Sequence, residues 1–258
     1  MSTIAIVTGA SSGLGREFVR LIDGGAAGQV DEIWVIARRA EQLDALVRTC
    51  KTAVRPFCLD LTDPMSFDII DAALAEEVDV TVRLLINNAG AGTFGSFALM
   101  REGRASEMAN LLMRAPVELI YRTLSYMRAG SRIINVASVA AFIPQPKLAL
   151  YSAAKRFILD LSRSLDAELG EVGIHVMALC PKFMRTEFLD KPGDALAAQR
   201  MTVIGFENVT DVAAAALKDA RAGKSLCIPS LDMKALYAVA KLAPYRVALA
   251  VERLIGAI

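Results

Sequence analysis

Short apolar segments alternate along the chain with longer segments in which apolar residues recur every three or four positions. The apolar segments are residues 4–8, 33–37, 54–59, 82–87, 132–138, 174–179 and 225–228. Most of them are continuously apolar, which is typical of parallel strands covered by helices on both faces. The pattern predicts βαβ units that build an α/β fold with a doubly wound parallel sheet of about seven strands.

No repeat, low-complexity tract or long linker divides the chain. We therefore expect one domain over residues 1–230 and a helical C-terminal extension over residues 231–258, packed on the same domain. Residues 190–211 form the most irregular stretch, and loops of that length often serve as lids. We accordingly expect a substrate loop at about residues 183–210.

Basic residues lie seven positions apart in the apolar extension, at Lys234 and Lys241 and again at Arg246 and Arg253. Pro244 is expected to break the extension into two short helices. One interpretation is a subunit contact or a cover over a pocket. The alternative is a peripheral contact with an anionic membrane surface.

The composition excludes several classes of function. The 258 residues carry 29 Lys and Arg against 28 Asp and Glu, which predicts no nucleic-acid partner. Although 54% of the residues are hydrophobic, no uncharged run reaches the ~18 residues of a membrane span. One histidine and four cysteines without a CxxC motif predict no metal site. The absence of a secretory signal and the isolated cysteines fit a reduced, cytoplasmic setting.

A glycine-rich turn follows the first apolar segment, where residues 8–15 read TGASSGLG. Such glycines let backbone N–H groups approach a pyrophosphate at a helix N-terminus, so the turn predicts a Rossmann-like dinucleotide site. Residues 9–13 also fit G-x-S-x-G, the nucleophile elbow of α/β-hydrolases, with His175 as the only candidate base. We disfavour that alternative, because the elbow would lie on the first strand and His175 lies inside an apolar run. A purely structural turn is the third interpretation.

The second apolar segment ends in Arg38 and Arg39, without a carboxylate. In dinucleotide folds an acid at this position binds the ribose hydroxyls, whereas a basic residue accommodates a 2′-phosphate. The pair predicts NADP(H) rather than NAD(H), with Arg38 as the main contact and Ser12 as a second one. The alternative is two solvated arginines at the start of a helix.

Tyr151 and Lys155 are one helical turn apart, and Ser138 closes an apolar segment thirteen residues before the tyrosine. A phenol with a pKa near ~10 is a weak base, and a neighbouring ammonium favours its charged form. Ser138 would hold a substrate oxygen at the carboxyl edge of the sheet. The alternative for Tyr151 and Lys155 is an exposed helix pair.

In chain order, these residues resemble the short-chain dehydrogenase/reductase family up to about Pro229. Residues 8–15 match its TGxxxGxG turn, residues 87–90 its NNAG motif and residues 181–186 its PGxxxT segment, with Lys182 in place of glycine. The resemblance implies that the catalytic residues are Asn110, Ser138, Tyr151 and Lys155. With the arginine pair, it implies a cofactor site of Gly9, Ser11, Ser12, Gly13, Leu14, Gly15, Arg38, Arg39, Asp60, Leu61, Asn88, Ala89, Gly90, Tyr151, Lys155, Pro181 and Thr186.

The resemblance also implies hydride transfer between NADPH and a carbonyl, with Tyr151 as proton donor, Lys155 lowering its pKa and Asn110 holding a relay water. Phenylalanines at positions 94, 97, 142, 183 and 188 favour an apolar alcohol or ketone that is steroid-, lipid- or acyl-like. A homodimer or homotetramer is expected. The alternative function is a catalytically idle NADP(H)-binding scaffold, since a fold does not determine an activity.

Overall fold

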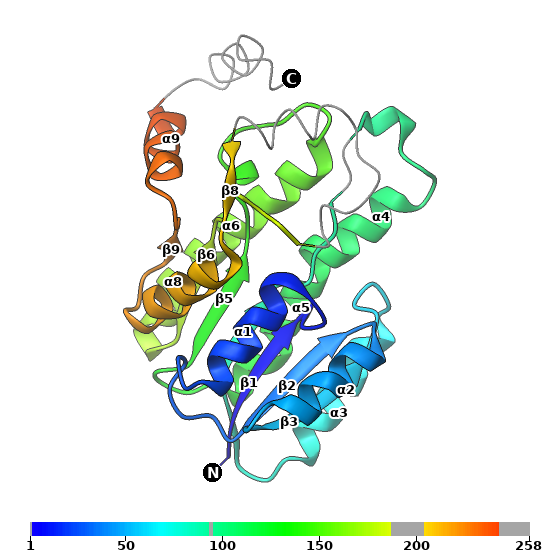
Figure 1. Cartoon of the computed structure of the whole chain (residues 1–258), viewed down its shortest axis with the longest axis vertical. Helices are drawn as coiled ribbons and strands as arrows, with labels where there is room; N and C mark the ends of the chain where they lie inside the picture. The colour runs from blue at the N-terminus through cyan, green and yellow to red at the C-terminus, as the bar shows by residue number, and fades with distance from the viewer. Residues whose placement is uncertain (1, 93–94, 187–203, 243–258) are drawn as a thin grey trace.

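The computed structural model describes residues 2–92, 95–186 and 204–242 (Figure 1). Within these residues, seven strands form one sheet in the order β3-β2-β1-β4-β5-β6-β9, and every neighbouring pair is parallel. The strands are β1 (Ser2–Thr8), β2 (Glu32–Ala37), β3 (Ala53–Cys58), β4 (Val80–Asn87), β5 (Arg132–Val136), β6 (His175–Leu179) and β9 (Leu226–Cys227). The predicted fold class and number of strands are confirmed.

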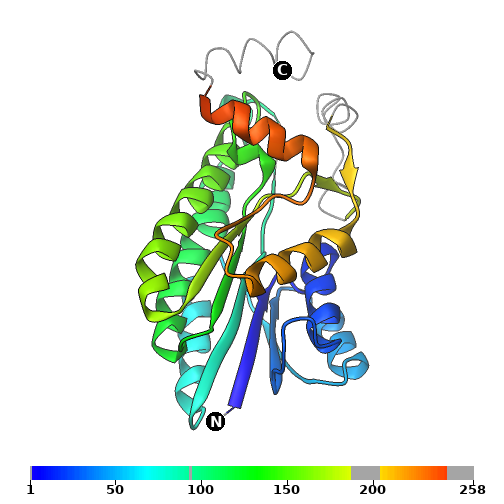
Figure 2. The ribbon, with the colours of Figure 1, turned by 90° about the vertical axis from the view of Figure 1, so that its left-hand side faces the viewer.

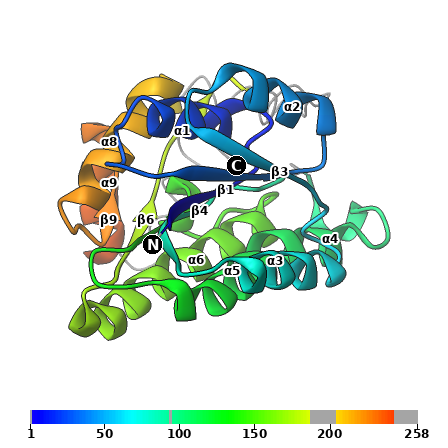
Figure 3. The same cartoon turned by 90° about the horizontal axis from the view of Figure 1, so that it is seen from below.

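Helices cover both faces of the sheet (Figure 3). On one face lie α1 (Gly13–Asp23), α2 (Ala40–Thr49) and α8 (Val209–Arg221), and on the other lie α3 (Met65–Glu76), α5 (Ala115–Thr123) and α6 (Ala149–Leu169). Buried apolar side chains form a separate cluster between the sheet and each helix layer. β1, β2, β4, β5 and β6 are largely apolar because each of them contributes buried side chains to both clusters.

The order of the strands reverses between β1 and β4, which lie side by side at the centre of the sheet. In such sheets, ligands bind outside the carboxyl ends of the strands at the point of reversal. Thr8 and Asn87 end these two strands. The topology therefore selects the edge at which the predicted motifs of both strands meet.

A long helical segment after β4 is not regular throughout. It runs through α4 (Arg104–Ala109), a π-helix at Asn110–Arg114 and α5. Short π segments inside α-helices frequently occur at functional sites. Short 3-10 helices lie at η1 (Phe97–Leu99), η3 (Leu124–Tyr126), η4 (Val139–Ala141) and η5 (Gly170–Val172).

The expected substrate loop contains regular structure at both of its ends. β7 (Phe183–Met184) pairs in parallel with β8 (Phe206–Glu207), and α8 begins at Val209. Residues 187–203, which include Phe188, lie outside the described residues. The stretch predicted as irregular over residues 190–211 is thus partly ordered by β8 and by the start of α8.

Of the C-terminal extension, the structure describes one helix, α9 (Leu231–Leu242), and the expected break at Pro244 lies outside the described residues. α9 lies at the end of the molecule toward which the strands point (Figure 2). Its inner side packs on a buried cluster through Met233 and Tyr237. No helix among the described residues is long and apolar enough to cross a membrane. The division of the chain at residue 230 stays a prediction.

Candidate active site

The turn between β1 and α1 leaves no room for side chains at its glycines. A Cβ on Gly9 would lie 2.8 Å from the Asn88 amide nitrogen, and a Cβ on Gly15 would lie 2.2 Å from the carbonyl oxygen of Gly9. Gly13 has a φ of +50° and lies against Thr186. The turn must therefore be built from glycine at these positions. Without side chains, its backbone N–H groups at the start of α1 can approach a pyrophosphate closely.

Thr8 connects this turn to the end of β4. Its hydroxyl accepts hydrogen bonds from the backbone N–H groups of Asn88 and Ala89, both at 2.9 Å. The Asn88 side chain donates to the carbonyl oxygen of Thr8 at 2.9 Å. These bonds hold the two neighbouring strand ends at the edge where the strand order reverses.

The two arginines after β2 have different surroundings. Arg39 donates to the Ser11 hydroxyl at 3.0 Å, which directs its guanidinium toward the glycine-rich turn. Arg38 has a side chain that is 75% exposed and lies 3.8 Å from Asp60. Burial raises the pKa of Asp60, but hydrogen bonds from Thr62 and the charge of Arg38 hold it below its usual value. The pair therefore places one anchored and one exposed cation beside the turn.

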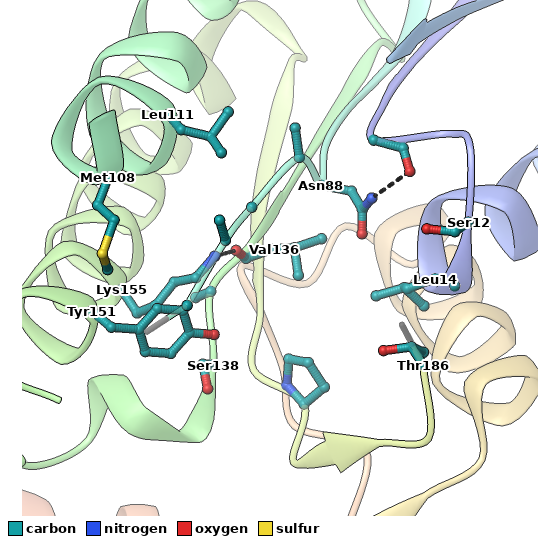
Figure 4. A pocket seen from close by; sticks show the side chains of 18 of the residues that line it. Ser12, Leu14, Asn88, Met108, Leu111, Val136, Ser138, Tyr151, Lys155 and Thr186 are labelled. Carbon is teal, nitrogen blue, oxygen red and sulfur yellow. Dashed lines mark hydrogen bonds between the residues drawn. The ribbon is translucent and has the colours of Figure 1, made fainter. Parts of the chain in front are cut away.

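Ser138, Tyr151 and Lys155 meet at the carboxyl end of β5. β5 ends at Val136, two residues earlier than the sequence pattern predicted, because Ser138 caps η4 by accepting a hydrogen bond from Ala140 at 3.1 Å. Tyr151 and Lys155 both lie on the first turns of α6. Lys155 Nζ donates to the carbonyl oxygen of Val136 at 2.6 Å, and the Tyr151 hydroxyl points toward Ser138 (Figure 4).

Burial dominates the titration of both groups. Burial raises the pKa of Tyr151 to about 12, although the hydrogen bond with Ser138 lowers it in part. Burial lowers the pKa of Lys155 to about 8, against the influence of the neighbouring Cys180. Desolvation of the phenolate thus acts against the lowering of the tyrosine pKa that the sequence predicts, and the influence of Lys155 with a bound cofactor stays a prediction.

One cavity of about 680 Å³ joins the glycine-rich turn to Ser138, Tyr151 and Lys155. Among the predicted site residues, only Gly15 and Asn110 are missing from its wall. Gly15 acts through its close packing against Gly9. Asn110 begins the π-helix, and the cavity is lined instead by Met108 and Leu111 on either side of it. The wall contains Gly9, Ser11, Ser12, Gly13, Leu14, Arg38, Arg39, Asp60, Leu61, Asn88, Ala89, Gly90, Ser138, Tyr151, Lys155, Pro181 and Thr186.

Sequence reasoning missed several cavity residues, among them Met108 and Arg104 with its ion-pair partner Glu107. No motif marks these positions, because they reach the cavity only through the folding of α4. Of the phenylalanines expected at the substrate, Phe183 lines the cavity, Phe142 is buried against Tyr237 and Phe97 is 59% exposed. Phe94 and Phe188 lie outside the described residues.

The hydrolase alternative does not fit the geometry. His175 is the first residue of β6, whereas Ser11 follows the last residue of β1. Because the strands are parallel, the two side chains lie at opposite edges of the sheet. His175 lies instead 3.6 Å from Asp166. In the part of the chain that the structure describes, no group of three or more His, Cys, Asp or Glu is arranged to hold a metal ion.

Comparison with known proteins identifies the family. The family model of the short chain dehydrogenases matches residues 3–197, so the chain belongs to this family. The 3-oxoacyl-[acyl-carrier-protein] reductase FabG of Staphylococcus aureus is 29% identical over 223 residues, which are 83% of this chain and 88% of that protein.

Solved structures agree with this assignment. A short-chain dehydrogenase from Sphingobium yanoikuyae in complex with NADPH superimposes with a TM-score of 0.77, at 27% identity over 100% of this chain and 96% of that one. A short chain dehydrogenase/reductase from Burkholderia phymatum in complex with NAD gives 0.78, at 22% identity over 92% of each chain. The chain is thus an oxidoreductase of the short-chain dehydrogenase family.

Proposed function

We propose that the protein is an NADP(H)-dependent oxidoreductase that interconverts a carbonyl and a secondary alcohol on an apolar, steroid-, lipid- or acyl-like molecule. The observation that carries this proposal is the convergence of Ser138, Tyr151 and Lys155 on the cavity that the glycine-rich turn also lines. One cavity can therefore hold a dinucleotide and a carbonyl next to each other.

The bare backbone at Gly9 and Gly13 fits a pyrophosphate, and Arg38 and Arg39 would hold a 2′-phosphate. Asp60 would contact the adenine end of the cofactor. Ala89, Gly90, Pro181 and Thr186 would enclose the nicotinamide end. The bound dinucleotide supplies hydride chemistry, and the protein supplies orientation and the proton.

On the protein side, Ser138 would donate a hydrogen bond to the substrate oxygen and so fix its position next to Tyr151. The neutral Tyr151 phenol would give its proton to that oxygen as the alcohol forms. A pKa of about 12 keeps this phenol protonated at neutral pH, which suits the direction of carbonyl reduction. The Lys155 ammonium would then support the return of a proton to Tyr151, with Asn110 holding a water beside it.

The apolar substrate class rests on the substrate end of the cavity. Val139, Ala140, Phe183, Met184 and Ile204 contribute side chains there. They offer contact area without formal charge, which favours an apolar ketone over a small charged aldehyde. The 3-oxoacyl substrate in the name of the Staphylococcus aureus relative is an example of this class.

We also propose that the chain forms a homodimer or homotetramer. Val117 and Tyr121 on α5 and Phe157 on α6 are 39%, 78% and 40% exposed, so neighbouring helices leave an apolar surface uncovered. Such surfaces often mark subunit contacts. No nucleic-acid partner is proposed, because positive and negative charges are balanced along the chain.

The test is a substrate panel. Steroid ketones, medium-chain 3-oxoacyl thioesters and small aldehydes are each offered with NADPH and with NADH, and oxidation of the cofactor is followed by absorbance. We expect turnover on an apolar ketone with a higher kcat/KM for NADPH. Tight NADPH binding without turnover on any member would instead favour a non-catalytic dinucleotide-binding protein.

A further inference from the structure

Lys182 occupies the position at which the family pattern has glycine. Its backbone is not among the described non-glycine residues with positive φ, so a lysine causes no strain there. Its side chain is only 11% exposed and lines the cavity next to Pro181. A long cation at the wall of an apolar cavity requires a partner, because an unpaired buried charge is costly.

Two carboxylates meet this lysine from different elements. The backbone N–H of Lys182 donates to Glu207 on β8 at 2.8 Å, and its Nζ donates to Asp232 on α9 at 2.8 Å. The other oxygen of Asp232 accepts from the backbone N–H of Met233 at 3.0 Å, which fixes the carboxylate in the first turn of α9. Lys182 thus connects the cavity wall to β8 and to α9.

α9 makes a second set of contacts through Tyr237, with Phe142 and Arg163. The Tyr237 ring packs on Phe142 at 4.7 Å between centroids, and its hydroxyl accepts a hydrogen bond from Arg163 at 2.9 Å. Phe142 directly follows η4, the short helix that Ser138 caps. The backbone N–H of Val139 donates to the carbonyl oxygen of Pro181 at 3.1 Å. α9 therefore touches both segments that hold the reacting end of the cavity.

We propose that Lys182 is a positioning residue whose ion pair with Asp232 fastens α9 to the cavity wall and holds the Pro181 segment in register with Ser138. The inference rests on the proposed function and adds a determinant of substrate binding to it. The ion pair joins Lys182 to α9, and the Pro181 segment reaches Ser138 through the hydrogen bond from Val139, so loss of the pair should weaken the binding of a bulky substrate more than the chemical step. Asp232 is 54% exposed, so the pair is open to screening by salt.

The test compares Lys182→Met, Lys182→Arg and Asp232→Asn in the full chain. We expect Lys182→Met and Asp232→Asn each to raise KM for the bulky ketone three- to tenfold, with kcat and the NADPH Kd within twofold. Lys182→Arg keeps the positive charge and should leave KM within twofold of the parental value. The double variant Lys182→Met with Asp232→Asn should raise KM little further than either single variant, because both substitutions remove the same ion pair.

A matched control is Lys224→Met, which removes an ion pair of similar length, 2.7 Å from Asp219 at the end of α8. It should leave KM unchanged. Hydrogen exchange supplies a readout that needs no turnover. The amides of residues 231–242 should exchange at least threefold faster in Lys182→Met and Asp232→Asn than in the parent, and not in Lys224→Met.

Unchanged exchange in α9, or a rise in KM with Lys182→Met that Asp232→Asn does not reproduce, overturns the proposal. The second result would mean that Lys182 acts on the substrate directly. If the parent reduces no ketone, the proposed function fails and the positioning role for substrate fails with it. The exchange result then still decides whether the ion pair fastens α9.

Discussion

At the scale of single residues, burial acts on Tyr151 and Lys155 in opposite directions along the pH axis. Both side chains are removed from water, and water stabilises the charged form of each. The pKa of Tyr151 therefore rises to about 12 and that of Lys155 falls to about 8. At neutral pH the tyrosine is therefore neutral and the lysine is still charged in most molecules. The proposed carbonyl reduction starts from these two protonation states, with Tyr151 as the proton donor.

The titration of Lys155 predicts a pH profile for reduction. The ammonium predominates below pH 8 and is lost as the pH rises through about 8, whereas Tyr151 keeps its proton until about 12. We expect kcat/KM for reduction to be level from pH 6 to 7.5 and then to fall about tenfold per pH unit above 8. Initial rates at saturating NADPH measure this. A profile that stays flat up to pH 10 would contradict a role for the lysine proton.

The arginine pair predicts the choice of cofactor. Charge-assisted hydrogen bonds to phosphate are worth ~1.5–3 kcal/mol, so Arg38→Ala with Arg39→Ala should raise the NADPH KM about 10- to 100-fold. The NADH KM should change less than about threefold, because NADH lacks the 2′-phosphate. Arg48→Ala, exposed on α2, is the control. Equal effects on both cofactors would show that the pair does not recognise the phosphate.

At the scale of elements, the turn between β1 and α1 depends on the absence of side chains. Its sequence pattern predicted a phosphate cradle, and the contacts show why particular glycines are needed. The same pattern could not show that Thr8 fastens the turn to β4, since that contact joins residues eighty positions apart. Local patterns predict turns and strands well, and long-range hydrogen bonds depend on the tertiary fold.

Gly15→Ala should disrupt this turn. The new methyl group would meet the carbonyl oxygen of Gly9 at 2.2 Å, and the backbone of a strand-to-helix turn cannot easily move away. We expect a loss of at least about 2 kcal/mol in the free energy of unfolding, measured by urea denaturation, and weaker NADPH binding. Gly170→Ala, where a Cβ meets no atom within 4 Å, should stay within about 0.5 kcal/mol of the parent. Equal stability of the two variants would refute the steric argument.

The catalytic elements were predictable to different degrees. The spacing of Tyr151 and Lys155 placed both on one helix, and α6 has them in its first turns. The end of β5 was predicted two residues too late, because the apolar run continues into η4 after the strand has ended. No motif in the sequence marks the π-helix that begins at Asn110.

At the scale of the whole molecule, the seven parallel strands and their two helix layers account for much of the apolar content. Alternating apolar and helical segments were enough to predict this architecture, because continuous apolar strands require cover on both faces. The partners of α9 were beyond sequence reasoning. The ion pair between Lys182 and Asp232 joins positions fifty residues apart, and no spacing rule relates them.

The two interpretations of the extension predict different behaviour in solution. We favour packing of the extension on its own domain, because Met233 and Tyr237 direct one side of α9 against the buried cluster around Phe142. The full chain and a chain of residues 1–230 should then both stay in the supernatant with anionic liposomes. They should also share one oligomeric mass, since α5 and α6 are unchanged. If the full chain sedimented with the liposomes and the chain of residues 1–230 did not, that result would support a membrane contact through Lys234 and Lys241.

In the proposed NADPH-dependent carbonyl reduction, Tyr151 passes the proton to the substrate oxygen. The most direct measurement compares Tyr151→Phe with the parent on the ketone that the panel selects, together with NADPH binding by fluorescence titration. Phenylalanine keeps the ring and removes only the hydroxyl, so kcat should fall by at least about a thousandfold while the NADPH Kd stays within twofold. More than a few per cent of parental turnover in this variant would show that Tyr151 is not the proton donor.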